Sequence, residues 1–251
     1  MRYLNLETRR TRIAIFDFTG CEGCQLQLLS FARTFVAFWK AIEVVTFRQA
    51  TSARGQDYDV ALIEGTISRA DEVERLRTIR DRARVLVALG SCAAFGGVNR
   101  LKNGLDPVAS CREEAHEDKP KDSLPVRAIK EVVPVDLEIP GCPVSRSEIE
   151  QFVQHLAIET PYELPTQPVC VECRQRLTTC TFDKGELCLG LITRGGCQAP
   201  CPAGGRGCWG CRGAVPDMNM TAFLDLAERR GHDARIIRER IALFGGFWVP
   251  T

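Results

Sequence analysis

Eight cysteines within residues 170–211 form two groups of four. The first group is Cys170, Cys173, Cys180 and Cys188, and the second is Cys197, Cys201, Cys208 and Cys211. Each group contains one C-x-x-C pair, and four thiolates are a ligand set for zinc ions and for iron–sulfur clusters. Two [4Fe–4S] clusters would use all eight cysteines, with a double zinc ribbon as the alternative.

Four further cysteines follow the ends of predicted strands. Cys21 and Cys24 lie in TGCEGCQ, Cys92 in GSCAAFGG and Cys142 in PGCPV, and a glycine precedes each within two positions. Ligands of an open parallel sheet bind outside the carboxyl ends of its strands, so we expect these thiols at one sheet edge. Ligands that are far apart in sequence on a large scaffold favour an iron–sulfur cluster over structural zinc, which usually uses two tight Cys pairs.

The first 160 residues alternate between predicted strands and helices. Short apolar, β-branched runs predict strands at 11–18, 42–47, 58–65, 84–90 and 131–141. Helical spacing predicts helices at 25–39, 68–83 and 145–158, the last two with Ser68 and Ser145 as N-caps. This alternation predicts an α/β fold built on a doubly wound parallel sheet.

The sequence changes character after the proline-containing stretch 160–168, which we interpret as a linker. We therefore predict two domains, residues 1–160 and 161–251. The cysteine-rich segment has few apolar residues and is expected to need metal clusters as staples, because it cannot bury a core alone. Little regular structure is expected there, apart from two terminal helices near 219–230 and 233–244.

The charge balance and the cysteine count narrow the class of protein. The 33 Lys and Arg and the 32 Asp and Glu give a net charge of +1, which argues against a nucleic-acid or membrane-surface binder. No apolar run reaches the ~18 residues of a membrane span. Thirteen cysteines, and no recognisable export signal before Cys21, indicate reduced thiols in a cytoplasmic protein rather than disulfides.

With these motifs in view, the chain resembles the small subunit of [NiFe] hydrogenases over nearly its full length. GCEGCQLQLL, IEGTIS, VALGSCAAFGG and IPGCPV resemble the flavodoxin-like N-terminal domain of that family. VCVECRQR, GELCLGLITRGGCQAPCP and GCWGCRGA resemble its cluster-rich, two-cluster C-terminal domain. The similarity extends to the cytoplasmic group, which includes sulfhydrogenase δ subunits and the small subunits of F420-non-reducing hydrogenases.

The resemblance implies an electron-transfer subunit with three [4Fe–4S] clusters and no catalytic residue of its own. Its implied ligands are Cys21, Cys24, Cys92 and Cys142 for the proximal cluster, Cys197, Cys201, Cys208 and Cys211 for the medial cluster, and Cys170, Cys173, Cys180 and Cys188 for the distal cluster. Cys201 replaces the proline usual in periplasmic relatives, which implies four irons in the medial cluster. The implied partners are a [NiFe] hydrogenase large subunit and a flavin- or Fe–S-bearing electron-transfer subunit.

Two alternatives belong to other classes. One is a complex-I-like Fe–S module without hydrogenase activity, although its 20-kDa-type subunit uses adjacent cysteines and one cluster. The other is a zinc-binding interaction protein. We expect no role for Cys111, which lies in a polar stretch. Glu22 is expected to face water or a partner cation, with proton transfer as the alternative, and Trp209 to pack or to shield a cluster.

Overall fold

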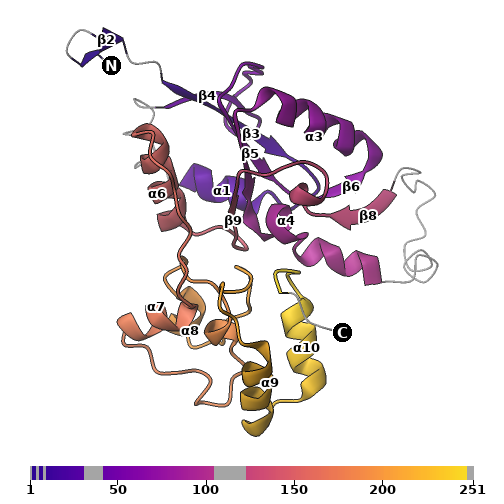
Figure 1. The fold of residues 1–251 in the computed structure, drawn as a ribbon, viewed down its shortest axis with the longest axis vertical. Coiled ribbons are helices and arrows are strands. Elements are labelled where there is room, and N and C mark those ends of the chain that lie inside the picture. The colour runs from indigo at the N-terminus through magenta and orange to yellow at the C-terminus, as the bar shows by residue number, and fades with distance from the viewer. Residues whose placement is uncertain (1, 4–5, 8–9, 31–41, 105–122, 248–251) are drawn as a thin grey trace.

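The computed structural model describes residues 2–3, 6–7, 10–30, 42–104 and 123–247. Cys111 and the second half of the helix predicted at 25–39 lie outside this part of the chain. Figure 1 shows the sheet with its helices in the upper part of the view and the C-terminal segment below it. Two short strands near the N-terminus, β1 (Arg2–Tyr3) and β2 (Leu6–Glu7), pair with each other away from the sheet.

A five-stranded parallel sheet forms the centre of the upper part, in the order β4-β3-β5-β7-β9. Its strands are β3 (Thr11–Asp17), β4 (Ile42–Phe47), β5 (Val60–Glu64), β7 (Val85–Leu89) and β9 (Leu137–Ile139). In chain order this arrangement is 2-1-3-4-5, the flavodoxin-like order of doubly wound folds. The predicted fold class is therefore confirmed.

The register of the sheet places four strand ends side by side. Asp17 pairs with Glu64, Glu64 with Leu89, and Leu89 with Ile139. The loops that follow these residues therefore leave the sheet at one edge, where bound groups lie in open parallel sheets.

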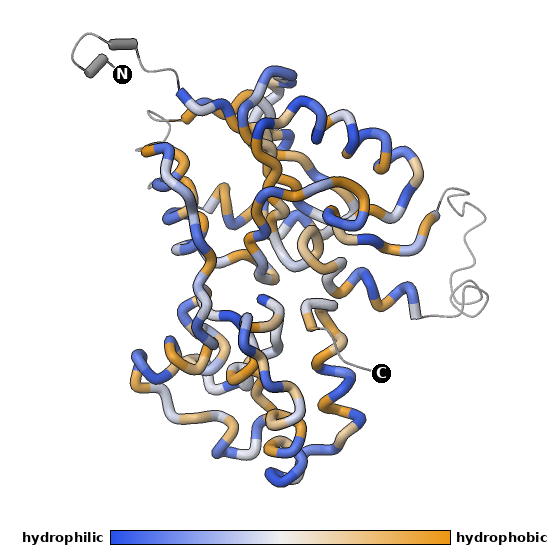
Figure 2. The backbone as a smooth tube through the Cα atoms, in the orientation of Figure 1, coloured by the Kyte–Doolittle hydropathy of each residue, from blue (hydrophilic) through white to orange (hydrophobic). Residues whose placement is uncertain are grey.

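Helices cover both faces of the sheet because alternate residues of each strand point to opposite sides. On one face, Ile13 and Leu62 pack with α1 (Gly23–Ser30) and α6 (Arg146–Ala157). On the other face, Ala14 and Ile63 pack with α3 (Ala70–Arg82) and α4 (Gly90–Phe95). Figure 2 shows the hydrophobic residues gathered along the central strands and the polar residues along the outer side of α3.

The start of α3 differs from the prediction. The prediction of Ser68 as the N-cap of α3 is wrong, because Ser68 lies in β6 (Ile67–Arg69), which pairs with β8 (Ser123–Arg127). The Glu72 carboxylate instead accepts the backbone N–H groups of Ser68 and Arg69, at 2.8 and 3.1 Å.

The last sheet strand is also shorter than the predicted 131–141. The 3₁₀ turn η2 (Ile129–Glu131) and then Pro134, which has no N–H to donate, precede β9. Ser145 is the N-cap residue of α6 as predicted, but its Oγ pairs with Ser147 Oγ at 2.9 Å rather than with a backbone N–H.

The C-terminal segment consists of short elements around an apolar cluster of its own. Its elements are α7 (Val169–Gln175), η3 (Leu189–Leu191), α8 (Pro200–Ala203), α9 (Met220–Arg229) and α10 (Ala234–Ala242). Phe223 of α9 and Ile237 and Ile241 of α10 pack against Val169 and Leu189. The two terminal helices therefore provide apolar surface that the cysteine-rich stretch lacks. In the described residues, no helix has both the length and the hydropathy that a membrane crossing needs.

Candidate functional site

The first quartet, defined as Cys21, Cys24, Cys92 and Cys142, lies at the carboxyl edge of the sheet. Cys21 and Cys24 follow β3, Cys92 is in the first turn of α4 after β7, and Cys142 follows β9. The Cys92 thiol interacts electrostatically with Cys142 and Cys21, and Cys24 interacts with Cys92 and Cys142. The strand register thus brings together four thiols that span more than 120 residues of sequence.

Two glycines leave the space that this quartet occupies. A Cβ added at Gly90 would lie 2.5 Å from Cys24 Sγ, and one at Gly97 would lie 2.8 Å from Cys92 Sγ. Both glycines also have positive φ angles, +89° and +57°, which other residues rarely adopt. Side chains at these positions would therefore displace thiols of the quartet.

Glu64 supports Cys24, and the sequence motifs do not assign it a role. This residue ends β5, is only 4% exposed, and accepts the backbone N–H groups of Cys24 and Gln25 at 3.0 and 3.2 Å. Burial raises the pKa of Glu64, while the N–H groups of Cys24 and Gln25 act in the opposite direction. The carboxylate holds the first turn of α1, and with it the Cys24 thiol, at the sheet edge.

The second quartet, defined as Cys170, Cys173, Cys180 and Cys188, lies in the C-terminal segment. Cys170 and Cys173 are on α7, and the Cys170 thiol interacts electrostatically with the other three. A Cβ added at Gly190 would lie 3.4 Å from both Cys170 Sγ and Cys188 Sγ. Two thiols from different parts of this segment therefore approach one point.

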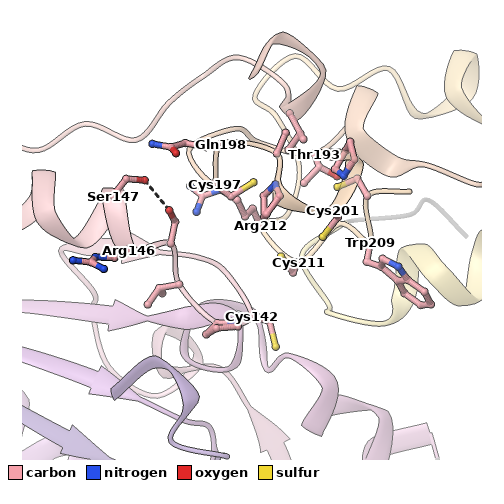
Figure 3. A pocket seen from close by; sticks show the side chains of 18 of the residues that line it. Cys142, Arg146, Ser147, Thr193, Cys197, Gln198, Cys201, Trp209, Cys211 and Arg212 are labelled. Carbon is pink, nitrogen blue, oxygen red and sulfur yellow. Dashed lines mark hydrogen bonds between the residues drawn. The ribbon is translucent and has the colours of Figure 1, made fainter. Parts of the chain in front are cut away.

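The third quartet, defined as Cys197, Cys201, Cys208 and Cys211, lines a cavity of about 640 Å³. Figure 3 shows Cys197, Cys201 and Cys211 around this cavity, with Cys142 below them on the side of the sheet and Trp209 to their right. Cys211 interacts electrostatically with each of the other three thiols. The third quartet thus lies next to a member of the first.

Hydrogen bonds join the quartets in series. At the junction of the first and third quartets, the Ser91 hydroxyl donates to the backbone carbonyl of Cys211 and accepts the Gly141 N–H at 3.2 Å. The backbone N–H of Cys142 also bonds to the Cys211 thiol. At the junction of the third and second quartets, the Cys208 N–H donates to Cys188 Sγ at 3.1 Å. The third quartet therefore lies between the other two.

The electrostatics of the thiols fit a cationic group held by each quartet. Burial and neighbouring thiols raise the pKa of Cys92 to about 12 and that of Cys170 to about 12, and burial raises the pKa of Cys197 to about 11. Four adjacent thiolates thus need a compensating positive charge, which the iron of a cluster supplies. Backbone N–H groups also point at thiols, from Val144 to Cys24 and from Gly210 to Cys208. Such bonds to sulfur are typical of Fe–S sites.

The cysteines that the structure describes are all reduced, which agrees with a role as ligands. In the described residues, no group of three or more His, Cys, Asp or Glu residues is arranged to hold a single metal ion. All twelve cysteines in the same part of the chain are free thiols. Each quartet therefore has all four of its thiols free to bind a group.

A buried ion pair fixes the third quartet against the sheet. Arg212 follows Cys211 and is 1% exposed, as is its partner Glu148 on α6. Its Nη2 lies 2.6 Å from Glu148 Oε1, Nη1 donates to the Pro140 carbonyl at 2.6 Å, and Nε donates to the Gly195 carbonyl at 2.7 Å. Neither residue was identified from the sequence, because a lone arginine or glutamate gives no signal of burial.

Comparisons with known proteins agree with this arrangement. Residues 21–156 match the family described as NADH ubiquinone oxidoreductase, 20 Kd subunit. The sulfhydrogenase 2 subunit delta of Pyrococcus furiosus is 34% identical over 231 residues, which cover 91% of this chain and 97% of that protein. The chain belongs to the hydrogenase small-subunit family. A subunit of the F420-non-reducing hydrogenase vhu of Methanocaldococcus jannaschii is 28% identical, with 97% and 96% of the two chains covered.

Solved structures of hydrogenases share the fold of this small subunit. A chain of an NAD⁺-reducing [NiFe]-hydrogenase superposes with a TM-score of 0.56 at 29% identity, covering 62% of this chain and 96% of that one. An actinobacterial-type NiFe-hydrogenase from Ralstonia eutropha gives a TM-score of 0.60 with 92% of this chain covered, but at 15% identity it shows the fold alone. The predicted family is therefore confirmed, and the chain is an iron–sulfur hydrogenase small subunit.

Proposed function

We propose that this chain is the electron-transfer small subunit of a cytoplasmic [NiFe] hydrogenase. It relays electrons between the Ni–Fe site of a large subunit and a redox partner subunit, through three [4Fe–4S] clusters. The observation that carries this proposal is the series of three thiol quartets whose neighbouring members are joined by hydrogen bonds. Electron transfer needs such short steps between redox groups, whereas a purely structural metal site does not.

The proposed ligands follow the three quartets. The first quartet holds the proximal cluster, the third holds the medial cluster and the second holds the distal cluster. The contacts of Cys211 with Cys142 and of Cys208 with Cys188 support this order, because they place the third quartet in the middle. We also propose that residues 1–160 form a flavodoxin-like domain with the proximal cluster and that residues 161–251 form a ferredoxin-like domain with the other two.

The exposure of individual ligands supports an entry and an exit for electrons. Cys21 and Cys142 of the first quartet are exposed, as are Cys180 of the second quartet and Cys201 of the third. Both ends of the series thus have ligands at the surface, and so does its middle. We propose that the large subunit covers the first end and that a flavin- or Fe–S-bearing subunit covers the second.

Iron analysis and EPR spectroscopy of the anaerobically purified protein test the proposal. We expect about 12 iron atoms per chain, since three clusters hold four each, and EPR signals from three reduced clusters. About four irons per chain would refute the three-cluster proposal. A colourless protein that retains zinc would instead support a zinc-binding interaction protein.

The match to the 20 Kd subunit family favours a second candidate, a complex-I-like module without hydrogenase activity. That match spans the first quartet but none of the cysteines after residue 156. The large subunit that co-purifies with the chain distinguishes the two candidates. H₂-dependent reduction of a dye by the purified complex supports the hydrogenase. A complex that is purified with its full iron content but without nickel, and that does not reduce the dye with H₂, supports the second candidate.

A further inference from the structure

Helix α10 places an arginine at the junction of the second and third quartets. Arg240 lies in the last turn of this helix, next to the Cys188 and Cys208 loops. Those two cysteines are themselves joined by the Cys208 N–H bond to Cys188 Sγ. A charge at this point therefore faces ligands of two quartets at once.

Two contacts hold the guanidinium of Arg240 in place. Its Nη1 donates to the Leu187 carbonyl at 2.8 Å, and its Cζ lies 3.9 Å from the centre of the Trp209 ring. Leu187 precedes Cys188, and Trp209 follows Cys208. The side chain is thus fixed by the immediate neighbours of one ligand from each quartet, and stacking on an aromatic ring is a favourable geometry for arginine.

The charge of Arg240 acts on buried sulfur. Cys188 and Cys208 are both buried, and Arg240 interacts electrostatically with both, as well as with the Glu186 carboxylate. The guanidinium stays protonated at every pH at which proteins fold. Charges interact more strongly in a partly buried setting than in water. The positive charge of Arg240 therefore changes the electrostatic potential at both the Cys188 and the Cys208 sulfur.

We propose that Arg240 raises the reduction potentials of the clusters bound by the second and third quartets. A fixed positive charge stabilises the state that carries one more electron, and charge near a cluster is one of the determinants of its potential. This inference rests on the proposed function. Arg240 acts through its charge. By raising these two potentials, it favours movement of electrons away from the first quartet toward the second and third.

Redox titration monitored by EPR tests this inference on the purified hydrogenase complex. We expect Arg240→Gln to lower the midpoint potentials of the medial and distal clusters and to leave that of the proximal cluster unchanged. The matched control is Arg235→Gln on the same helix, because Arg235 is 74% exposed and pairs with Glu239 at 3.1 Å. Unchanged potentials in an iron-replete Arg240→Gln variant would overturn the inference.

Two further variants separate charge from folding. Arg240→Lys keeps the charge, so its potentials are expected to lie closer to those of the wild type than to those of Arg240→Gln. Equal shifts in both variants would contradict a role for the charge. If the Arg240→Gln variant does not retain its iron, the Trp209→Leu variant is used for the titration instead. Trp209→Leu removes the ring that Arg240 stacks on and keeps the arginine. Trp209→Leu is expected to lower the same two potentials, and unchanged values overturn the inference.

Iron content distinguishes a failure of this inference from a failure of the proposed function. A wild-type complex without iron would refute both. An iron-replete wild type with unshifted potentials in the variants would refute only the role of Arg240.

Discussion

Arg212 and Glu148 form a buried ion pair across 64 residues of sequence, with both side chains 1% exposed. The pair links the loop of the third quartet to α6, the helix that follows the first quartet. Because Arg212 also donates to the carbonyls of Pro140 and Gly195, its guanidinium has partners on both sides of this junction. This arginine is therefore one of the contacts that fix the third quartet against the first.

Loss of this arginine should destabilise the protein strongly. Arg212→Met leaves the buried Glu148 carboxylate without its cationic partner, which costs about 3–5 kcal/mol of unfolding free energy. Anaerobic denaturant unfolding measures the loss. The control is Arg77→Met, since Arg77 forms an exposed pair with Glu74 and its removal should change stability by less than ~1 kcal/mol. Similar losses in both variants would contradict the role of the buried pair.

If the three proposed clusters are present, Gly90→Ala should remove the proximal one and spare the other two. The added Cβ would lie 2.5 Å from Cys24 Sγ, so the thiol cannot keep its position. We expect about 8 irons per chain instead of about 12, as measured by iron analysis. Gly185→Ala is the matched control, because Gly185 has a similar φ of +85° and nothing within 4 Å of its added Cβ. Full iron content in Gly90→Ala would show that the space beside Cys24 is not required.

Ser91→Ala should loosen the junction of the first and third quartets without removing iron. The change leaves the Cys211 carbonyl and the Gly141 N–H without their partner in a buried place, which costs about 1–3 kcal/mol. We expect lower stability in anaerobic unfolding together with a full complement of iron. Ser91→Thr restores a hydroxyl and serves as the control. Stability equal to wild type in Ser91→Ala would argue against this hydrogen-bonded bridge.

The contribution of Asp136 to stability should not change with pH near neutrality. Asp136 accepts the Leu86 N–H at 2.7 Å and faces Arg80 at 2.5 Å. Burial opposes ionisation, but these two partners outweigh it and lower the pKa of Asp136 below its usual value. The stabilisation is then fully present above the unfolded-state pKa of about 4 and is lost as pH falls through the lower folded-state pKa.

Denaturant unfolding of wild type and Asp136→Asn from about pH 5 to 8 measures this contribution. We expect a constant difference in unfolding free energy over that range, because the carboxylate stays ionised in both states. A wild-type advantage over Asp136→Asn that shrinks as pH rises across this range would mean a raised folded-state pKa and would contradict the prediction. Asp81→Asn, at an exposed position of α3, is the control and should show little difference at any pH.

The fold was predictable because its strands and helices are local patterns of sequence. Apolar runs such as 84–90 identify a strand wherever it lies in the sheet, and the strand β7 (Val85–Leu89) was found within one residue at each end. The spacing of Cys170, Cys173, Cys180 and Cys188 likewise predicts one set of thiols from local sequence alone. Expected helix starts were less reliable, since Ser68 has a capping side chain but Glu72 performs that role.

The residues that hold the quartets in place depend on the tertiary structure alone. Glu64, Ser91, Arg212 and Arg240 are charged or polar residues, and each has at least one partner that lies 40 to 120 positions away in the sequence. Taken by itself, each is a residue type that is most often exposed, so its sequence neighbours give no sign of burial. Folding brings these side chains against backbone groups and thiols, away from water. Their roles follow from that desolvation, which only the packing of distant segments creates.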